Sequence, residues 1–243
     1  MEFIKAVLRK FYYLINDGKI TSLKVYKHLA NSKWIIDSRF GMAYFKGYYE
    51  PKICDYLLKN IKNDSVFVDV GSHAGYFSLF AATLATKGKV YSFEPEPGNY
   101  NYINKIKDLN GINNWDVINS GVGNEKGTLF FSTGPSSTTG KIADAGDFKV
   151  EVITLDDVLI NTTSVDVIKI DVEGFGGKVL QGAVKIIDKH LPKIMFEVHK
   201  NSDELEVLKQ ILGNRYLLKD LDTGKIISDD KEPHFIISEP TSN

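Results

Sequence analysis

Cysteine and long apolar runs are scarce in this sequence of 243 residues. Its single cysteine, Cys54, excludes an internal disulfide framework and suits a reducing compartment. No apolar stretch reaches the length of about 20 residues that a membrane-spanning helix needs, and charged residues interrupt the apolar N-terminus, unlike in a signal peptide. The net charge of -1 provides no basic surface for a nucleic acid. We therefore expect a cytoplasmic protein without a nucleic-acid partner.

The length and composition indicate one globular domain. Hydrophobic residues make up 43% of the chain and charged residues 25%, which is ordinary for a protein with a sizeable buried core. The sequence contains no internal repeat and no linker that would divide it. We expect a single domain over residues 1–243, in which a helical extension at 1–48 precedes a core at 49–243.

The N-terminal segment has an apolar stripe at helical spacing. The stripe consists of Phe3, Ile4, Val7, Leu8, Phe11 and Tyr12. This spacing predicts an amphipathic helix that ends near Gly18, because glycine tolerates a left-handed cap. Its apolar face could pack on the main domain or on a second subunit of a homo-oligomer. Alternatively, the helix could lie on a membrane surface, with Lys5, Arg9 and Lys10 on its polar face.

Residues 65–94 form the unit around which we expect the fold to be organised. A buried strand, a turn from Gly71 to Gly75 and a helix rich in alanine and leucine follow one another there. A second strand comes next at 89–93, and Glu94 follows it directly. This β-loop-α-β unit suits a nucleoside, because the turn lets the backbone approach a ligand and the carboxylate can accept two ribose hydroxyls.

The rest of the chain alternates strands with helices. We expect further strands at 115–119, 128–132, 148–153, 165–170, 193–198, 216–227 and 234–238, and a turn at 222–224 interrupts the strand at 216–227. We expect further helices at 51–61, 99–109, 179–187 and 204–212. Such alternation predicts a mostly parallel sheet with helices on both faces. The last two strands have no helix between them, which predicts an antiparallel edge.

The glycine turn argues against two common nucleotide sites. A dinucleotide fingerprint needs three glycines, but here Gly71 is followed by His73 and Tyr76 at the other two places, and Tyr76 would crowd a pyrophosphate. A P-loop needs a Gly-Lys-Ser/Thr sequence, which does not follow. What remains is a nucleoside without a phosphate, with Glu94 for its ribose. S-adenosyl-L-methionine fits that description.

Several sequence blocks resemble the FkbM family of S-adenosylmethionine-dependent methyltransferases. They are YYEP at 48–51, VFVDVGSHAGYFSL at 66–79, VYSFEPEP at 90–97, and the pair TLDDV at 154–158 with DVIKIDVEG at 166–174, followed by GAV at 182–184 and FEVH at 196–199. The resemblance implies a class I methyltransferase fold, which is an α/β Rossmann-like fold. Its seven-stranded, mostly parallel sheet has an antiparallel last strand and helices on both faces.

The resemblance also implies a set of cofactor-binding residues. They are Asp69, Gly71 and Gly75 at the methionine end, His73 in the same turn, Glu94 at the ribose, Ser120 near the adenine, and Asp171. Two positions depart from the family pattern. His73 stands where many members have Asn, and Gly176 stands where Glu is usual.

Polar groups at the ends of two neighbouring strands are candidates for catalysis, because ligands bind at the carboxyl ends of strands in open α/β sheets. They are Asp171, Glu173, Glu197 and His199, and we expect Asp171, Glu173 and His199 to be catalytic. Methyl transfer to a hydroxyl needs a base that removes a proton while oxygen, carbon and sulfur are aligned. Asp171, Glu197 and His199 would also suit a divalent cation, although we expect no metal.

We therefore expect an S-adenosylmethionine-dependent O-methyltransferase. On the family resemblance, its acceptor is a hydroxyl of a sugar, a glycan or another natural product, and we expect the loop at 132–148 and the aromatic segment at 44–49 to form the acceptor pocket. Two alternatives stay open. The first is a non-catalytic nucleoside-binding or structural homologue, which the glycine in place of the usual Glu at 176 would allow. The second is a nicotinamide-dependent oxidoreductase, against which Tyr76 argues because it would crowd the pyrophosphate.

Overall fold

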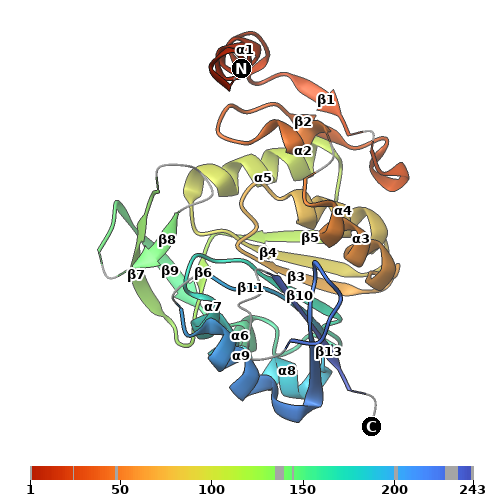
Figure 1. Cartoon of the computed structure of the whole chain (residues 1–243), viewed down its shortest axis with the longest axis vertical. Coiled ribbons are helices and arrows are strands. Elements are labelled where there is room, and N and C mark those ends of the chain that lie inside the picture. The colour runs from red at the N-terminus through yellow and green to blue at the C-terminus, as the bar shows by residue number, and fades with distance from the viewer. Residues whose placement is uncertain are drawn as a thin grey trace.

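The computed structural model describes residues 2–23, 25–46, 49–134, 140–143, 145–199, 202–227 and 235–241. A seven-stranded sheet crosses the centre of the molecule, and helices cover both of its faces (Figure 1). A smaller sheet lies to one side, and the N-terminal segment lies at the end of the molecule opposite the C-terminus. Among the described residues, no helix is both long and apolar enough to span a membrane.

The central sheet has the strand directions that the sequence predicts. In spatial order its strands are β12 (Tyr216–Asp220), β13 (Phe235–Pro240), β11 (Lys193–Glu197), β10 (Val167–Ile170), β3 (Val66–Val70), β4 (Lys89–Phe93) and β5 (Trp115–Ile118). The strands from β11 to β5 pair in parallel, whereas β13 is antiparallel to both of its neighbours. The prediction of a mostly parallel seven-stranded sheet with an antiparallel last strand is confirmed.

Two clusters of buried apolar side chains cover the two faces of this sheet. In β3, Phe67 belongs to one cluster and Val68 to the other, because successive residues of a strand point to opposite faces. The helices of the first cluster include α3 (Pro51–Asn60), α4 (Tyr76–Leu84) and α5 (Pro97–Leu109). Those of the second are α6 (Leu155–Val158), α7 (Gly176–Gln181), α8 (Val184–His190) and α9 (Glu204–Leu212). Burial on both faces explains why the central strands are nearly continuous apolar runs.

The smaller sheet is inserted between β5 and β10. Its strands are β6 (Gly121–Val122), β9 (Phe148–Ile153), β7 (Gly127–Ser132) and β8 (Lys141–Ala143), in that spatial order. β7 and β9 pair antiparallel, and both match strands that the sequence predicts. The sequence does not predict β8, because a strand of three residues is too short to show a periodic pattern. Residues 135–139 and 144, in the loop expected at the acceptor pocket, lie outside the described residues.

One helix predicted at 179–187 is two helices in the structure. α7 ends at Gln181 and α8 begins at Val184, with Gly182 between them. The break between α7 and α8 lies against another segment, because a Cβ atom on Gly182 would lie 1.9 Å from the carbonyl oxygen of Gly123. The strand predicted at 216–227 with a turn inside it corresponds to β12, which ends at Asp220, and the turn follows at 221–223. The turn after β12 is held locally, since the N–H and the hydroxyl of Thr223 both donate hydrogen bonds to Oδ1 of Asp220.

The N-terminal segment contains two short strands and three helical elements. They are α1 (Glu2–Asn16), β1 (Ile20–Ser22), η1 (Lys27–Leu29), β2 (Lys33–Ile35) and α2 (Met42–Lys46). α1 ends next to Gly18, whose φ of +78° is the left-handed conformation that the sequence predicts. The hydroxyl of Tyr102 in α5 donates a hydrogen bond to the carbonyl of Ile35, which fastens β2 to the main domain.

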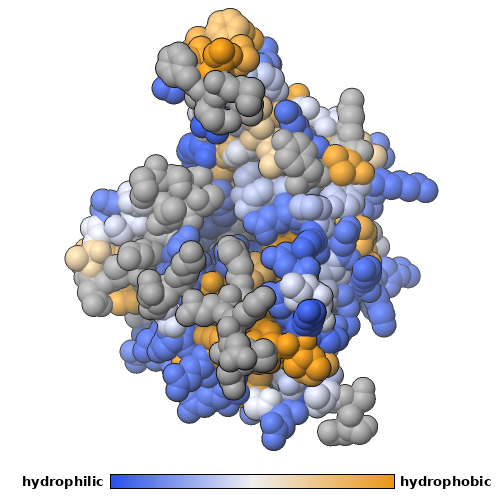
Figure 2. Space-filling view, in the orientation of Figure 1, coloured by the Kyte–Doolittle hydropathy of each residue, from blue (hydrophilic) through white to orange (hydrophobic). Residues whose placement is uncertain are grey.

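The apolar face of α1 points away from the main domain. Its exposed apolar side chains are Ile4, Val7, Leu8, Phe11, Leu14 and Ile15. They form part of the orange surface over α1 in Figure 2. α1 contacts the rest of the chain through Tyr13, which is buried, and through Tyr12, which stacks on Phe45. The interpretation that the apolar face packs on the main domain is therefore wrong, and a second subunit or a membrane surface stays open.

Candidate active site

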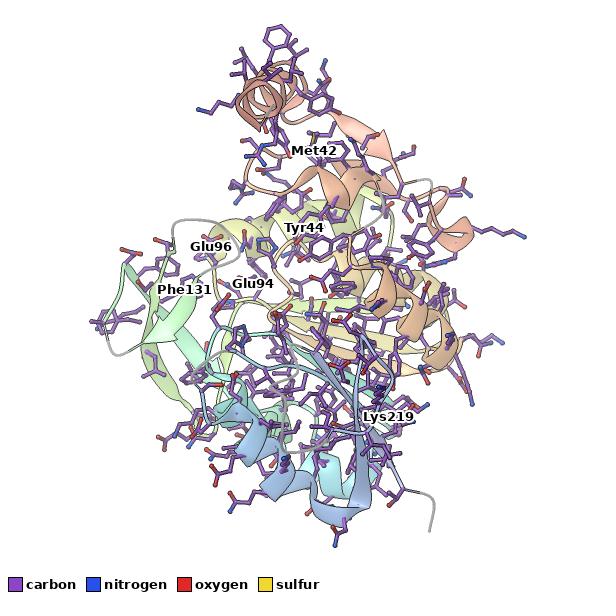
Figure 3. The ribbon with its side chains drawn as sticks, in the orientation of Figure 1. Met42, Tyr44, Glu94, Glu96, Phe131 and Lys219 are labelled. Carbon is purple, nitrogen blue, oxygen red and sulfur yellow. The ribbon has the colours of Figure 1, made fainter. Side chains whose placement is uncertain are left out.

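A cavity of about 350 Å³ opens at the carboxyl ends of β3, β4 and β10. Its described walls combine the turn after β3, the segment after β4, the ends of β10 and β11, and Phe131 of the smaller sheet. In Figure 3, Glu94 lies near the centre, with Tyr44 of α2 on one side and Phe131 on the other. This is the edge of the sheet where open α/β folds bind their ligands.

The turn between β3 and α4 brings the backbone to the cavity wall. Gly71 has a φ of +80°, and a Cβ atom on it would lie 2.0 Å from the carbonyl oxygen of Asp171. Any other residue would therefore displace the end of β10. The backbone N–H of His73, which has a φ of 51°, donates a hydrogen bond to Oε2 of Glu94 at 2.8 Å. The turn and the carboxylate after β4 thus form one structural unit.

Glu94 is a buried carboxylate at the cavity wall. Its Oε2 accepts the bond from His73, and its Oε1 accepts one from the N–H of Glu96 at 3.0 Å. Burial raises the pKa of Glu94 to about 8, although these bonds favour the ionised form. A carboxylate offers about four acceptor positions, so Glu94 can still accept hydrogen bonds from hydroxyls in the cavity.

Beneath the cavity, Lys169 links two carboxylates. Its Nζ lies 2.8 Å from Oδ2 of Asp171 and 3.8 Å from Oδ1 of Asp69. Asp69 is fully buried and also accepts a hydrogen bond from the hydroxyl of Ser78 at 2.6 Å. Burial lowers the pKa of Lys169, but the two carboxylates outweigh burial and raise it above its ordinary value. Lys169 is therefore charged at neutral pH and joins the ends of β3 and β10.

Asp171 and Glu197 share a proton at the ends of β10 and β11. Burial raises the pKa of Asp171, but Lys169 and a hydrogen bond with Glu197 outweigh burial and hold it far below its ordinary value. Burial and the same hydrogen bond raise the pKa of Glu197 to about 10. Ligand atoms of Asp171, Glu197 and His199 lie within 4.8 Å of one another, a spacing that would suit a cation. Lys169 and the shared proton already offset the negative charge of this group.

His199 lies between two carboxylates at the edge of the cavity. Its Nδ1 lies 3.3 Å from Oε2 of Glu204, and its Nε2 lies 3.5 Å from Oε2 of Glu173, which lines the cavity. The hydrogen bond with Glu204 raises the pKa of His199, and burial opposes it only in part. Nδ1 of the ring is thus held by Glu204, while Nε2 lies next to the cavity-lining residue Glu173.

Aromatic residues of the N-terminal segment contact the glycine turn. The hydroxyl of Tyr44 lies 2.9 Å from Nδ1 of His73, and the ring of Tyr44 stacks on Tyr49, a cavity-lining residue, with centroids 4.0 Å apart. Burial lowers the pKa of His73 to about 4, so its ring is neutral at physiological pH. The segment expected to help form the acceptor pocket therefore reaches the cavity through Tyr49.

The structure brings together most of the residues that the sequence predicts for the site. Those that line the cavity are Gly71, His73, Glu94, Ser120, Asp171, Glu173 and Glu197. His199 adjoins the cavity through Glu173. Two others face elsewhere among the described residues: Asp69 contacts Lys169 and Ser78, and a Cβ atom on Gly75 would meet Trp115 and Ile103. Which of these residues bind a cofactor stays a prediction.

The sequence pattern does not reveal Lys169 and Glu204 as parts of the site. Lys169 gives a signal that could have found it, because a lysine inside a fully buried strand must be paired. Glu204 gives no such signal. It is the first residue of a helix, where acidic residues are common, and its partners come from two other segments.

Comparison with known families decides which of the nucleoside-binding folds this is. The model of the methyltransferase FkbM domain matches residues 69–222, which is more than half of the chain. The chain belongs to the FkbM methyltransferase family. The resemblance found in the sequence blocks is thereby confirmed, and with it the class I methyltransferase fold.

Relatives of this FkbM-family chain include two curated proteins. The hexuronic acid methyltransferase AglP of Haloferax volcanii is 27% identical over 165 residues, which cover 66% of either chain. Methyltransferase 1 of Beauveria bassiana is 22% identical over 182 residues, covering 63% of this chain and 72% of that protein. The chain thus spans just under two thirds of the length of the haloarchaeal relative.

Solved structures show the same fold. A methyltransferase FkbM from Methylobacillus flagellatus superimposes with a TM-score of 0.52 at 20% identity, covering 73% of this chain and 44% of that one. An rRNA methylase from Streptococcus thermophilus superimposes with a TM-score of 0.50 at 16% identity, covering 78% of this chain and 95% of that one. At these identities the likeness extends to the fold alone.

Proposed function

We propose that this protein is an S-adenosylmethionine-dependent methyltransferase that methylates a hydroxyl of a sugar. The observation that carries the proposal is one cavity in which Glu94, a buried carboxylate held by the glycine turn, lies opposite proton-accepting groups at the ends of β10 and β11. Membership of the FkbM family supports methyl transfer. The similarity to a protein described as a hexuronic acid methyltransferase supports a sugar as the acceptor.

The residues on one side of the cavity fit S-adenosylmethionine. The remaining acceptor positions of Glu94 suit the two ribose hydroxyls, and the glycine turn lets the backbone come close to the methionine end. Val122 and Phe131 provide apolar surface near Ser120, where the adenine would lie. The cavity volume is in the range of ordinary small-molecule sites.

When bound, S-adenosylmethionine supplies an electrophilic methyl group, whose bond to sulfur breaks with the electron pair left on sulfur as the acceptor oxygen attacks. In the proposed reaction Nε2 of His199 accepts the hydroxyl proton. Glu173, 3.5 Å from that nitrogen, stabilises the positive charge that then develops on the ring. Asp171 stays ionised beside Lys169 and orients the acceptor hydroxyl.

The charges around the acceptor side favour a neutral or amino sugar over an acidic one. The described lining residues there include Glu50, Asp171 and Glu173, while Glu197 holds a proton and is neutral, and the described lining contains no lysine or arginine. Lys169 lies behind Asp171 and is 1% exposed. A sugar carboxylate would meet groups of its own sign, which costs binding energy. We therefore propose that the acceptor differs in charge from the hexuronic acid named for AglP.

The first experiment is a thermal-shift screen with S-adenosylmethionine, S-adenosylhomocysteine, NAD and NADP. A ligand that binds the folded state raises the melting temperature by mass action. We expect a shift with the first two ligands alone. A shift with NAD or NADP alone would favour an oxidoreductase, and no shift with any of them would favour a structural homologue.

A second experiment tests the acceptor. Methyl transfer is measured by release of S-adenosylhomocysteine with three matched glycosides: methyl glucoside, methyl glucosaminide and methyl glucuronide. We expect turnover with the neutral or the amino sugar and none with the glucuronide. Turnover that is fastest with the glucuronide would contradict the proposed acceptor charge and would leave the methyltransferase itself intact.

A further inference from the structure

Glu204 is a buried carboxylate that joins three segments around the proposed base. It begins α9, its side chain is 1% exposed, and each of its oxygens has partners from another part of the chain. Oε1 accepts a hydrogen bond from the N–H of Gly176, at the start of α7, at 2.8 Å. Oε2 accepts one from the N–H of His199 at 2.9 Å and lies 3.3 Å from Nδ1 of the same residue. The carboxylate therefore fixes both the backbone and the ring of His199.

The glycine at 176 makes room for this carboxylate. A Cβ atom on Gly176 would lie 2.8 Å from Oε1 of Glu204 and 2.6 Å from Cζ of Phe196. Real Cβ atoms do not approach other atoms this closely, so a side chain at 176 would displace the carboxylate of Glu204 and the ring of Phe196. This chain thus has Gly176 where the family pattern has Glu, and the carboxylate of Glu204 from α9 lies next to that position.

The position of Glu204 selects one tautomer of His199. An ionised carboxylate accepts hydrogen bonds and donates none, so the nearby Nδ1 must carry the proton. Burial raises the pKa of Glu204, but the hydrogen bonds from His199 and Gly176 outweigh it and keep the pKa below its ordinary value, which keeps the group ionised. In neutral His199 the lone pair is then on Nε2, the atom that faces the cavity-lining residue Glu173.

We infer that Glu204 is the positioning residue of His199, and that position 176 is glycine to admit it. This inference rests on the proposed function, in which His199 is the base. Glu204 holds the ring of His199 in the tautomer whose Nε2 takes the proton from the sugar hydroxyl. Glu204 also stabilises the imidazolium that forms, as a carboxylate does behind a catalytic histidine. The other groups that face His199 among the described residues are Asp171, Glu173, Glu197 and the hydroxyl of Ser202.

The test is nuclear magnetic resonance of the histidine rings in the wild type and in Glu204→Gln. The signals of His199 are assigned by their loss in His199→Asn. In the wild type we expect the Nδ1–H tautomer at high pH, and the Nε2–H tautomer would overturn the inference. In Glu204→Gln we expect His199 to titrate about 1 pH unit lower or more, because a nearby negative charge has been removed. An unchanged titration would equally overturn it.

Glu206→Gln is the matched control. Glu206 lies in the first turn of the same helix and is exposed, so the substitution removes the same charge without touching His199. We expect its His199 titration to match that of the wild type. Gly176→Ala is a second variant for the case in which Glu204→Gln does not fold. Its added methyl group would push Oε1 away, and we expect a shift of the His199 titration in the same direction as in Glu204→Gln.

Kinetics separate this inference from the proposed function. If methyl transfer is observed, the acid limb of kcat against pH should move to lower pH in Glu204→Gln, while the plateau falls at least about tenfold because the weaker base accepts the proton less well. A loss of activity without movement of the acid limb would reduce Glu204 to a structural role. If the wild type transfers no methyl group, the tautomer and titration still decide whether Glu204 positions His199.

Discussion

At the scale of single residues, Glu94 tests the cofactor half of the reaction. Hydrogen bonds to a charged group contribute roughly 1.5–3 kcal/mol each, so we expect Glu94→Ala to weaken S-adenosylhomocysteine binding by about tenfold or more. Isothermal titration calorimetry measures the dissociation constant. Glu125→Ala, at an exposed position after β6, serves as the control and should bind like the wild type. An unchanged dissociation constant in Glu94→Ala would remove this residue from the site.

The raised pKa of Glu94 predicts that ligand binding depends on pH. Ribose hydroxyls donate to the ionised carboxylate, so binding should release a proton wherever the free protein holds one, which is below a pH of about 8. Affinity for S-adenosylhomocysteine should therefore rise from pH 6 to pH 8 and then level off. Calorimetry in two buffers of different ionisation enthalpy would show the released proton. A flat affinity and no proton release would show that Glu94 is already ionised in the free protein.

Lys169 tests the support beneath the cavity. Lys169→Met would leave Asp69 buried without its cationic partner, and breaking a buried ion pair costs about 3–5 kcal/mol. We expect a lower free energy of unfolding in urea, and a partial recovery in the double variant that also carries Asp69→Asn. Lys178→Met, at an exposed position of α7, should be close to the wild type. A Lys169→Met protein as stable as that control would rule out the ion pair as a support.

At the scale of elements, Gly71 decides how closely β3 and β10 approach at their carboxyl ends. In Gly71→Ala the added Cβ atom would lie 2.0 Å from the carbonyl oxygen of Asp171, and alanine would also have to adopt a φ of +80°. We expect a loss of stability of at least about 1–3 kcal/mol together with weaker cofactor binding, because Asp171 would shift. Thermal unfolding and calorimetry measure the two effects.

Gly127→Ala is the matched control for that substitution. Gly127 begins β7, its φ is not positive, and a Cβ atom there would meet nothing within 4 Å. Its stability should equal or slightly exceed that of the wild type, because alanine restricts the unfolded chain. If Gly71→Ala is as stable as Gly127→Ala and binds the cofactor equally well, the close approach of β3 and β10 is not required for stability or binding.

At the scale of the whole molecule, the balance of charge in the cavity predicts activity without a metal. Lys169 and the proton on Glu197 already offset the negative charge around Asp171. We expect the melting temperature and methyl transfer to survive exhaustive treatment with EDTA. Activity that is lost with EDTA and restored by Mg²⁺ or Mn²⁺ would instead assign Asp171, Glu197 and His199 as ligands of a cation.

Local sequence pattern predicts most of the fold, because each predicted strand is short, apolar and followed by a turn. β4 and α9 have the predicted bounds, and the antiparallel end of the sheet follows from the missing helix between the last two strands. Pattern fails where a distant contact ends an element. The break between α7 and α8 is of this kind, since a Cβ atom on Gly182 would lie 1.9 Å from the carbonyl oxygen of Gly123. The early start of α7 also depends on a distant residue, because the N–H of Gly176 donates a hydrogen bond to Glu204 of another helix.

The sequence by itself determined the parallel sheet, the glycine turn with Glu94 after the next strand, and the family to which the chain belongs. These features depend on residues close together in the chain. Only the tertiary structure decided that Asp69 faces Lys169, that the apolar face of α1 is exposed, and that Glu204 occupies the space beside Gly176. Pairing and burial depend on which segments meet, and a carboxylate 28 positions from its partner leaves no periodic trace in the chain.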